Sequence, residues 1–234
     1  MPGYQTRQQQ VAIRGADSLL IRSLLDRQQY ADPDGRAEAA GFSSATWPLF
    51  GMLWPSGLQL AAHMAARPLK AGERILEVGC GLALASLVCH RRGIDVTASD
   101  AHPLAPDFLH DNLSLNALAP LVYRRGDWAG RAGVPAAAHP ADAAPVQGRF
   151  DVIMGSDVLY ERDEQGHLAR FVECHAEPDA EVLIVDPDRG NRPAFTRRMS
   201  GLGFVLHETT LRTPEADGLP YRGRLLRYSR TAPA

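Results

Sequence analysis

The segment Ile75-Leu76-Glu77-Val78-Gly79-Cys80-Gly81-Leu82-Ala83 decides which fold we expect for this chain. It begins as a short apolar strand, passes through a turn with two glycines, and continues into a helix-like stretch. Gly79 and Gly81 let the backbone bend sharply and approach a ligand closely, which a Cβ atom would obstruct. The dinucleotide-binding fingerprint has a third glycine three residues after the second, but this chain has Leu84 there. The turn therefore favours a ligand without phosphates.

Apolar segments and helix-like segments alternate around this turn. The apolar segments are bounded by Gly, Asp or Pro, as is typical of strands, and they cover residues 74–78, 94–99, 121–123, 150–154 and 181–185. The helix-like segments cover residues 82–92, 103–117, 164–175 and 192–202. Because strands joined by crossover helices run parallel, we predict an α/β fold with an open, doubly wound sheet.

The two ends of the chain depart from this alternation. Residues 204–211 and 222–228 are expected to be two strands with no helix between them, which predicts an antiparallel C-terminal hairpin and a mostly parallel sheet of seven strands. Residues 1–70 are expected to be an irregular N-terminal extension that packs on the core, and residues 71–234 the main domain. The Ala-, Pro- and Gly-rich residues 131–148 predict a surface loop to which we assign no chemistry.

Two acidic residues stand where the glycine turn would meet a ligand. Asp100 ends the second expected strand, and an acid at this place in doubly wound folds accepts hydrogen bonds from ribose hydroxyls. Glu77, at the tip of the first strand, is expected close to it. Such a pair would repel phosphates and attract a cation. S-adenosylmethionine combines a ribose, no phosphate and a positive sulfonium, so we predict it as the cofactor. A tight strand–helix connection without a ligand is the alternative.

A third acidic position follows the third expected strand, in Gly126-Asp127-Trp128. Here Asp127 could accept a hydrogen bond from the adenine amino group, and the Trp128 indole could stack on the adenine ring. Considered alone, Trp128 fits core packing at least as well as a cofactor wall.

Taken together, these motifs resemble a class I, seven-strand methyltransferase that uses S-adenosylmethionine. The resemblance covers about residues 73–230, and Ala83 stands where the family has a third glycine. It rests on Glu77-Val78-Gly79-Cys80-Gly81, Asp100, Asp127-Trp128, and the expected fourth strand with the residues after it, Phe150-Asp151-Val152-Ile153-Met154-Gly155-Ser156-Asp157. The resemblance implies a Rossmann-like methyltransferase fold.

Two further motifs resemble the protein-lysine methyltransferase subgroup often called family 16. They are Trp54-Pro55-Ser56-Gly57 before the core and Asp157-Val158-Leu159-Tyr160 after the fourth strand. In that subgroup the tryptophan lies near the cofactor and the acid-x-x-Tyr motif lines the methyl-transfer site. The segment Asp186-Pro187-Asp188-Arg189 also resembles a loop of bacterial and mitochondrial members.

The resemblance thus implies a set of site residues. Asp157 and Tyr160 are the expected catalytic residues, with Asp157 orienting the acceptor amine and Tyr160 forming a wall of the lysine channel. A helix N-cap and ordinary packing are the respective alternatives. The expected cofactor-binding residues are Trp54, Glu77, Gly79, Gly81, Asp100, Asp127, Trp128 and Ser156.

The implied function is N-methylation of lysine side chains in a protein substrate. The alternative is a small-molecule N- or O-methyltransferase of the same fold. RNA is a further possible acceptor class, supported only by arginines near residues 189–198 and 222–230, and a binding module without activity is the last alternative. Asn112 and Asn116, four apart on an expected helix, either cap the following turn or reach the cofactor.

Composition restricts the remaining classes. The 25 Lys and Arg residues against 27 Asp and Glu give a net charge of −2, which argues against nucleic-acid binding by bulk charge. The three cysteines form no CxxC pair and the eight histidines no HExxH spacing, so we expect no metal. Without an apolar signal in residues 1–16 or a membrane-length apolar stretch, we expect a cytoplasmic protein with no membrane partner. Acceptor identity, number of methyl groups and oligomeric state stay open.

Overall fold

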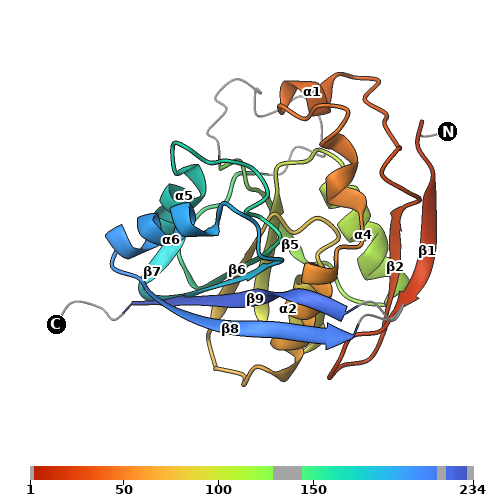
Figure 1. Ribbon diagram of the computed structural model, residues 1–234. Helices are drawn as coiled ribbons and strands as arrows, with labels where there is room; N and C mark the ends of the chain where they lie inside the picture. Colours follow the sequence, from red (N-terminus) through yellow and green to blue (C-terminus); the bar gives the residue numbers. More distant parts are fainter. Residues whose placement is uncertain (1–2, 129–143, 215–219, 231–234) are drawn as a thin grey trace.

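The structure of this chain is a computed structural model that describes residues 3–128, 144–214 and 220–230. Within these residues the main sheet has seven strands in the order β5-β4-β3-β6-β7-β9-β8 (Figure 1). Strands β3 to β7 pair in parallel, whereas β9 runs antiparallel to β7 and to β8. The bounds are β3 Arg74–Val78, β4 Asp95–Asp100, β5 Val122–Arg125, β6 Phe150–Ser156, β7 Ala176–Asp186, β8 Val205–Pro214 and β9 Pro220–Ser229. The predicted doubly wound α/β fold with an antiparallel C-terminal hairpin is confirmed.

Helices cover both faces of the sheet. Their bounds are α2 Pro55–Ala66, α3 Leu84–Arg91, α4 Ala105–Leu115, α5 His167–His175 and α6 Arg192–Gly201. Ile75 and Leu183 pack in one cluster with α2, α3 and α4, while their chain neighbours Leu76 and Val182 pack in a second cluster with α5 and α6. Because successive strand residues point to opposite faces, the central strands are buried on both sides.

Most predicted elements agree with the structure to within a few residues, and β7 differs most. It was expected at residues 181–185 but begins at Ala176. Its first half, Ala-Glu-Pro-Asp-Ala, has no large apolar side chain, and it pairs with β6 only through Ala176 and Phe150 before the register shifts. A strand segment with so little regular pairing and no apolar alternation leaves no signal in the sequence.

The N-terminal segment is more regular than expected. Strands β1 (Thr6–Val11) and β2 (Leu19–Leu24) form a separate antiparallel hairpin beside α4 (Figure 1). Helix α1 (Arg36–Ala39) and the 3₁₀ helix η1 (Trp47–Gly51) follow. The expectation of an irregular lead-in was therefore wrong. Of the six residues of β1 only Val11 is buried, so apolar alternation cannot mark this strand in the sequence.

Two asparagines of α4 take the place of a neighbouring strand at the free edge of β2. Asn116 accepts from the Leu20 N–H at 2.9 Å and donates to the Leu20 carbonyl oxygen at 2.8 Å. Asn112 likewise accepts from the Arg22 N–H at 2.7 Å and donates to the Arg22 carbonyl oxygen at 3.4 Å. Four residues of a helix and two residues of a strand both span about 6 Å. The spacing of the two asparagines along α4 therefore matches the spacing of Leu20 and Arg22 along β2. Of the two alternatives from the sequence, capping holds for Asn116, which is the C-cap of α4 and donates to the Asn112 carbonyl oxygen at 2.7 Å, whereas neither asparagine lines the cavity described below.

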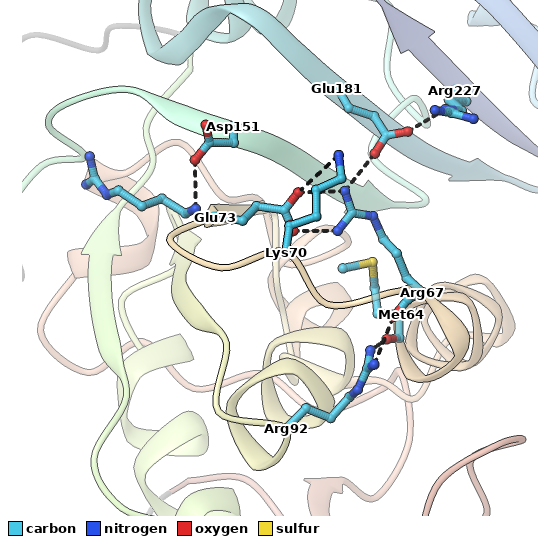
Figure 2. A network of polar contacts seen from close by, with 9 residues as sticks. Met64, Arg67, Lys70, Glu73, Arg92, Asp151, Glu181 and Arg227 are labelled. Atoms are coloured by element: carbon cyan, nitrogen blue, oxygen red, sulfur yellow. Dashed lines mark hydrogen bonds and ion pairs between the residues drawn. The ribbon is translucent and has the colours of Figure 1, made fainter.

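Ion pairs anchor the C-terminal end of α2 at the edge of the sheet where the parallel strands begin (Figure 2). Arg67, directly after α2, donates to Glu73 at 2.8 Å and to Glu181 at 3.0 Å. Arg227 of β9 pairs with Glu181 in turn. Arg92, after α3, donates to the carbonyl oxygens of Met64 and Arg67. This network joins two helices to β7 and β9.

Two predictions from the sequence fall partly outside the described residues. The expected surface loop at 131–148 lies outside them except for its last residues, where Pro145 forms a parallel bridge with Arg125 and Val146 is buried. The connection between β8 and β9 lies outside them at residues 215–219. In the part of the chain that the structure describes, no helix has the length and apolar character needed to cross a membrane.

Candidate functional site

A cavity of about 1290 Å³ opens at the edge of the sheet where the parallel strands end. All ten site residues that the sequence predicted line it, although they come from chain positions 54 to 160. Carboxyl ends of neighbouring parallel strands meet at one edge, which is where ligands bind in open α/β sheets. The predicted residues that line this cavity are Trp54, Glu77, Gly79, Gly81, Asp100, Asp127, Trp128, Ser156, Asp157 and Tyr160.

The glycine turn after β3 has left-handed backbone geometry at three positions. Gly79 has φ 58°, Gly81 has φ 50°, and Ala83, the N-cap of α3, has φ 58°. A Cβ atom on Gly81 would lie 2.7 Å from the Phe50 carbonyl oxygen, and one on Gly79 would lie 2.9 Å from Val158 Cγ1. The chain's own packing therefore requires glycine at both positions. Ala83 holds its conformation without that freedom, at a cost of about 1–2 kcal/mol.

Glu77 is buried at the end of β3 and bound to the first turns of α3. One of its carboxylate oxygens accepts from the Ser86 N–H at 2.8 Å and from the Ser86 hydroxyl at 2.5 Å. Burial raises the pKa of Glu77 to about 7, against the hydrogen bonds from Ser86, which lower it. Glu77 therefore takes up a proton more readily than a free carboxylate would.

Asp100 holds the glycine turn in place from the end of β4. Its two carboxylate oxygens accept from the backbone N–H groups of Gly81 at 2.9 Å and His102 at 2.8 Å. Burial raises the pKa of Asp100, and these backbone hydrogen bonds oppose that rise. A carboxylate has about four acceptor positions, so Asp100 can hold the turn and still accept from a ligand hydroxyl.

Two tryptophans border the cavity from different directions. Trp54, directly before α2, donates its indole N–H to the Leu49 carbonyl oxygen at 2.8 Å, which fixes the ring on η1. Trp128 packs partly against the second hydrophobic cluster, and its ring lies 3.2 Å from where a Gly79 Cβ atom would be. Its buried indole N–H has no hydrogen-bond partner among the described residues. Trp128 thus packs against the core with part of its surface and lines the cavity with another part.

Asp157 follows β6 in a left-handed conformation, with φ 56°. Its backbone N–H donates to the Val185 carbonyl oxygen at 2.8 Å, so the turn after β6 is bonded to the end of β7. Its carboxylate, 10% exposed, receives two hydrogen bonds from the Arg189 guanidinium, at 2.5 Å from Nε and 2.9 Å from the second nitrogen. Tyr160 lies at the same end of the cavity with 41% of its surface exposed.

The sequence reasoning missed the Asp157–Arg189 pair. From the sequence, residues 186–189 were assigned only by their resemblance to a loop, and Arg189 was counted among the arginines that would support an RNA acceptor. The two residues are 32 positions apart, and no local pattern connects them. The one available signal was that both follow neighbouring parallel strands, β6 and β7, whose carboxyl ends meet.

Sequence comparison identifies the family. Residues 55–219 match the sequence model of a protein family described as "Methyltransferase domain". An electron transfer flavoprotein beta subunit lysine methyltransferase from Xenopus laevis is 26% identical, over 61% of this chain and 53% of its own length. A calmodulin-lysine N-methyltransferase from Arabidopsis thaliana is also 26% identical, over 66% of this chain and 52% of its own length. The chain thus spans about half of these two relatives.

A third curated relative aligns over more of its length. EEF1A lysine methyltransferase 3 from Mus musculus is 27% identical, over 78% of this chain and 74% of its own length.

Solved structures support the same fold. A methyltransferase from Pyrococcus furiosus superposes with a TM-score of 0.52 at 19% identity, covering 70% of this chain and 78% of its own. The ribosomal protein L11 methylase from Lactobacillus delbrueckii subsp. bulgaricus superposes with a TM-score of 0.51 at 20% identity. This match covers 74% of this chain and 78% of the methylase. At these identities the likeness speaks for the fold alone. Because the family model matches well over half of the 234 residues, the chain belongs to the methyltransferase-domain family.

Proposed function

We propose that this chain transfers a methyl group from S-adenosylmethionine to the lysine side chains of a protein. The observation that carries the proposal is that one cavity gathers the glycine turn, three acids at the ends of β3, β4 and β5, and the acid-x-x-Tyr motif after β6. These groups suit a ligand with a ribose, an adenine and a positive centre. The lysine methyltransferases among the curated relatives support a protein acceptor.

In this proposal each cavity residue has a role toward the cofactor. Asp100 accepts from the ribose hydroxyls with the acceptor positions that Gly81 and His102 leave open. Asp127 accepts from the adenine amino group and Trp128 stacks on the ring. Glu77, Ser156 and Trp54, whose ring is fixed on η1, line the same cavity and complete the cofactor site. Bound S-adenosylmethionine would supply a methyl group on a sulfonium that is already a good leaving group.

The protein's remaining task is to present a neutral amine in line with that methyl group. A free lysine has a pKa near 10.4, so deprotonation at pH 7 costs about 4.6 kcal/mol. A carboxylate stabilises the ammonium form, and Asp157 therefore acts as an orienting acceptor rather than a strong base. Tyr160 forms a wall of the channel to the surface. Alignment and exclusion of water supply the rate enhancement.

We also propose that residues 1–70 form an extension that packs on a methyltransferase domain covering residues 71–234. Buried residues of β2 and η1, such as Ile21 and Trp47, share one hydrophobic cluster with Ile75 and Phe108. The match to the family model begins earlier, at residue 55. Helix α2 therefore lies in the proposed extension and also within the matched family domain.

Calorimetry tests the cofactor first, with S-adenosylmethionine, S-adenosylhomocysteine and NADH as the ligands. We expect the first two to bind and NADH not to bind. Binding of NADH, or of none of the three, would contradict the proposal.

Incorporation of tritiated methyl groups into a cell lysate then tests the acceptor class. We expect the label to be lost on protease treatment and kept on RNase treatment, and mass spectrometry to find 14-dalton additions on lysines. Label that resists protease and passes a small-molecule filter would support the alternative, a small-molecule N- or O-methyltransferase. Label lost on RNase treatment would indicate an RNA acceptor.

A further inference from the structure

The guanidinium of Arg189 occupies the carboxylate that the proposed function reserves for the acceptor. Both Asp157 oxygens receive a hydrogen bond from it, at 2.5 and 2.9 Å. Charge-assisted, two-point pairs of this kind are among the stronger hydrogen bonds in proteins. Because the Asp157 side chain is only 10% exposed, a second cation has little access to this carboxylate while Arg189 is bound.

The backbone of the Arg189 loop is held independently of this ion pair. The Arg189 N–H donates to Asp186 at 2.9 Å, and Asp186 is fully buried at the end of β7. Two residues further on, the Asn191 side-chain amide donates to the Leu159 carbonyl oxygen at 2.9 Å. The guanidinium can therefore leave Asp157 while these two contacts keep the loop in position.

The surroundings also make removal of the guanidinium easy. Its side chain is 39% exposed, so it enters water without first breaking out of a core. The carboxylate of the neighbouring Asp188 is already paired with two other arginines, Arg192 and Arg224. Arg189 is thus a removable cation on a nearly buried acid.

We propose that Arg189 is a specificity-determining residue, a resident cation that occupies Asp157 until the amine of the acceptor displaces it. The inference rests on the proposed function, because it takes the acceptor to be an amine that binds at Asp157. A cationic amine can replace the guanidinium charge for charge, whereas a neutral alcohol would leave Asp157 without its counter-ion. The competition lowers the affinity for any isolated amine, so a productive acceptor needs further contacts with the cavity rim.

The test is an NMR titration of the full chain with n-butylammonium, which mimics the lysine side chain, and with n-butanol as the neutral control. We expect Arg189→Gln to bind n-butylammonium about tenfold more tightly than the wild type, because the competent state is no longer a minor one. The gain should disappear in Arg189→Gln combined with Asp157→Asn, and n-butanol should show none. Arg197→Gln is the matched control, an exposed arginine that lines the same cavity, and it should bind like the wild type.

A second measurement uses the wild type alone and does not depend on a variant that folds. The Arg189 Nε–H signal, assigned by its absence in Arg189→Gln or by through-bond correlation, should lose protection from hydrogen exchange as n-butylammonium is added. Equal or weaker binding by Arg189→Gln would overturn the inference, as would an Nε–H that stays protected while the amine binds, or no amine binding to either protein. None of these results requires methyl transfer, so failure of the proposed function would be seen separately, in the S-adenosylmethionine calorimetry for the cofactor and in the methyl labelling of the lysate for the acceptor.

Discussion

Individual residues at the cavity combine a structural and a chemical role. Asp100 holds the glycine turn through Gly81, and Asp157 adopts a left-handed conformation that a residue other than glycine takes at a cost. Such strain and such burial of acids are typical of functional sites. Experiments on variants of these residues must therefore measure stability and methyl-transfer activity separately.

Asp157→Ala is expected to lower methyl transfer by about 100-fold, because the amine loses the group that orients it. The affinity for S-adenosylmethionine should stay within about threefold of the wild type, because Asp157 is not among the proposed cofactor contacts. Single-turnover kinetics and calorimetry measure the two effects. Asp157→Asn, which tolerates the left-handed backbone better, controls for strain. Unchanged turnover in both variants would remove Asp157 from the mechanism.

His102 predicts an acid-sensitive contribution to stability. It stacks on Phe50 with ring centroids 3.7 Å apart, and burial lowers its pKa to about 3. Below its ordinary pKa of 6.5 the unfolded chain binds a proton that the folded chain does not, so the free energy of unfolding falls as pH drops, by about 2 kcal/mol between pH 6.5 and 5. Glu77, whose folded pKa is raised to about 7, acts in the opposite direction over this range.

The variant His102→Phe isolates this contribution. Urea unfolding of both proteins at pH 6.5, 5.5 and 5 should show that the free energy of unfolding of the variant falls less, or rises more, on acidification than that of the wild type. The readout is the slope against pH, because the substitution also changes packing. Parallel slopes in the two proteins would show that His102 does not resist protonation in the fold.

At the scale of elements, side chains complete hydrogen bonding that the sheets leave open. The hairpin β1–β2 is a separate two-stranded sheet, which is rarely stable alone. Its free edge on β2 is covered by Asn112 and Asn116 of α4. The pairing positions the N-terminal segment, which in turn places Phe50 against Gly81 at the cavity.

Asn112→Ala is expected to lower the free energy of unfolding by about 1–3 kcal/mol, because it leaves the Arg22 backbone groups without partners in a partly buried place. Asn116→Ala should cost less, since water can reach Leu20, which is 36% exposed. Urea unfolding of the two variants measures the difference. An equal or reversed order would contradict the view that burial decides the cost.

At the scale of the whole molecule, the two edges of the sheet have separate tasks. The edge where the parallel strands end holds the cavity, and the edge where they begin holds the ion-pair network around Arg67 (Figure 2). Helix α2 links them, since Trp54 precedes it at the cavity and Arg67 follows it in the network. Hydrogen bonds from Arg67 to Glu73 raise the pKa of that guanidinium further above its ordinary value.

Arg67→Met is expected to destabilise the protein by about 3–5 kcal/mol, because it leaves Glu73 as a buried charge without its main partner. Lys70→Met is the matched control. Lys70 approaches the same carboxylate at 3.8 Å but is 69% exposed, so its loss should cost at most about 1 kcal/mol. In the folded variants S-adenosylmethionine should bind as in the wild type. A large loss of affinity in Arg67→Met at full folding would show that the two edges are coupled.

The alternation of strands and helices, the glycine turn and the acids at strand ends could all be predicted from the sequence, because each is a local pattern of a few residues. The acids of the cavity share one place since parallel topology brings strand ends together, whereas Trp54 was predicted from the family resemblance. What these residues contact became visible in the folded chain alone. Strand β2 is held by α4 and carries the polar strand β1 with it, and Asp157 pairs with Arg189, which lies 32 residues away. Hydrogen bonds and ion pairs between distant segments depend on where the packed elements put the side chains, and a local pattern carries no record of that.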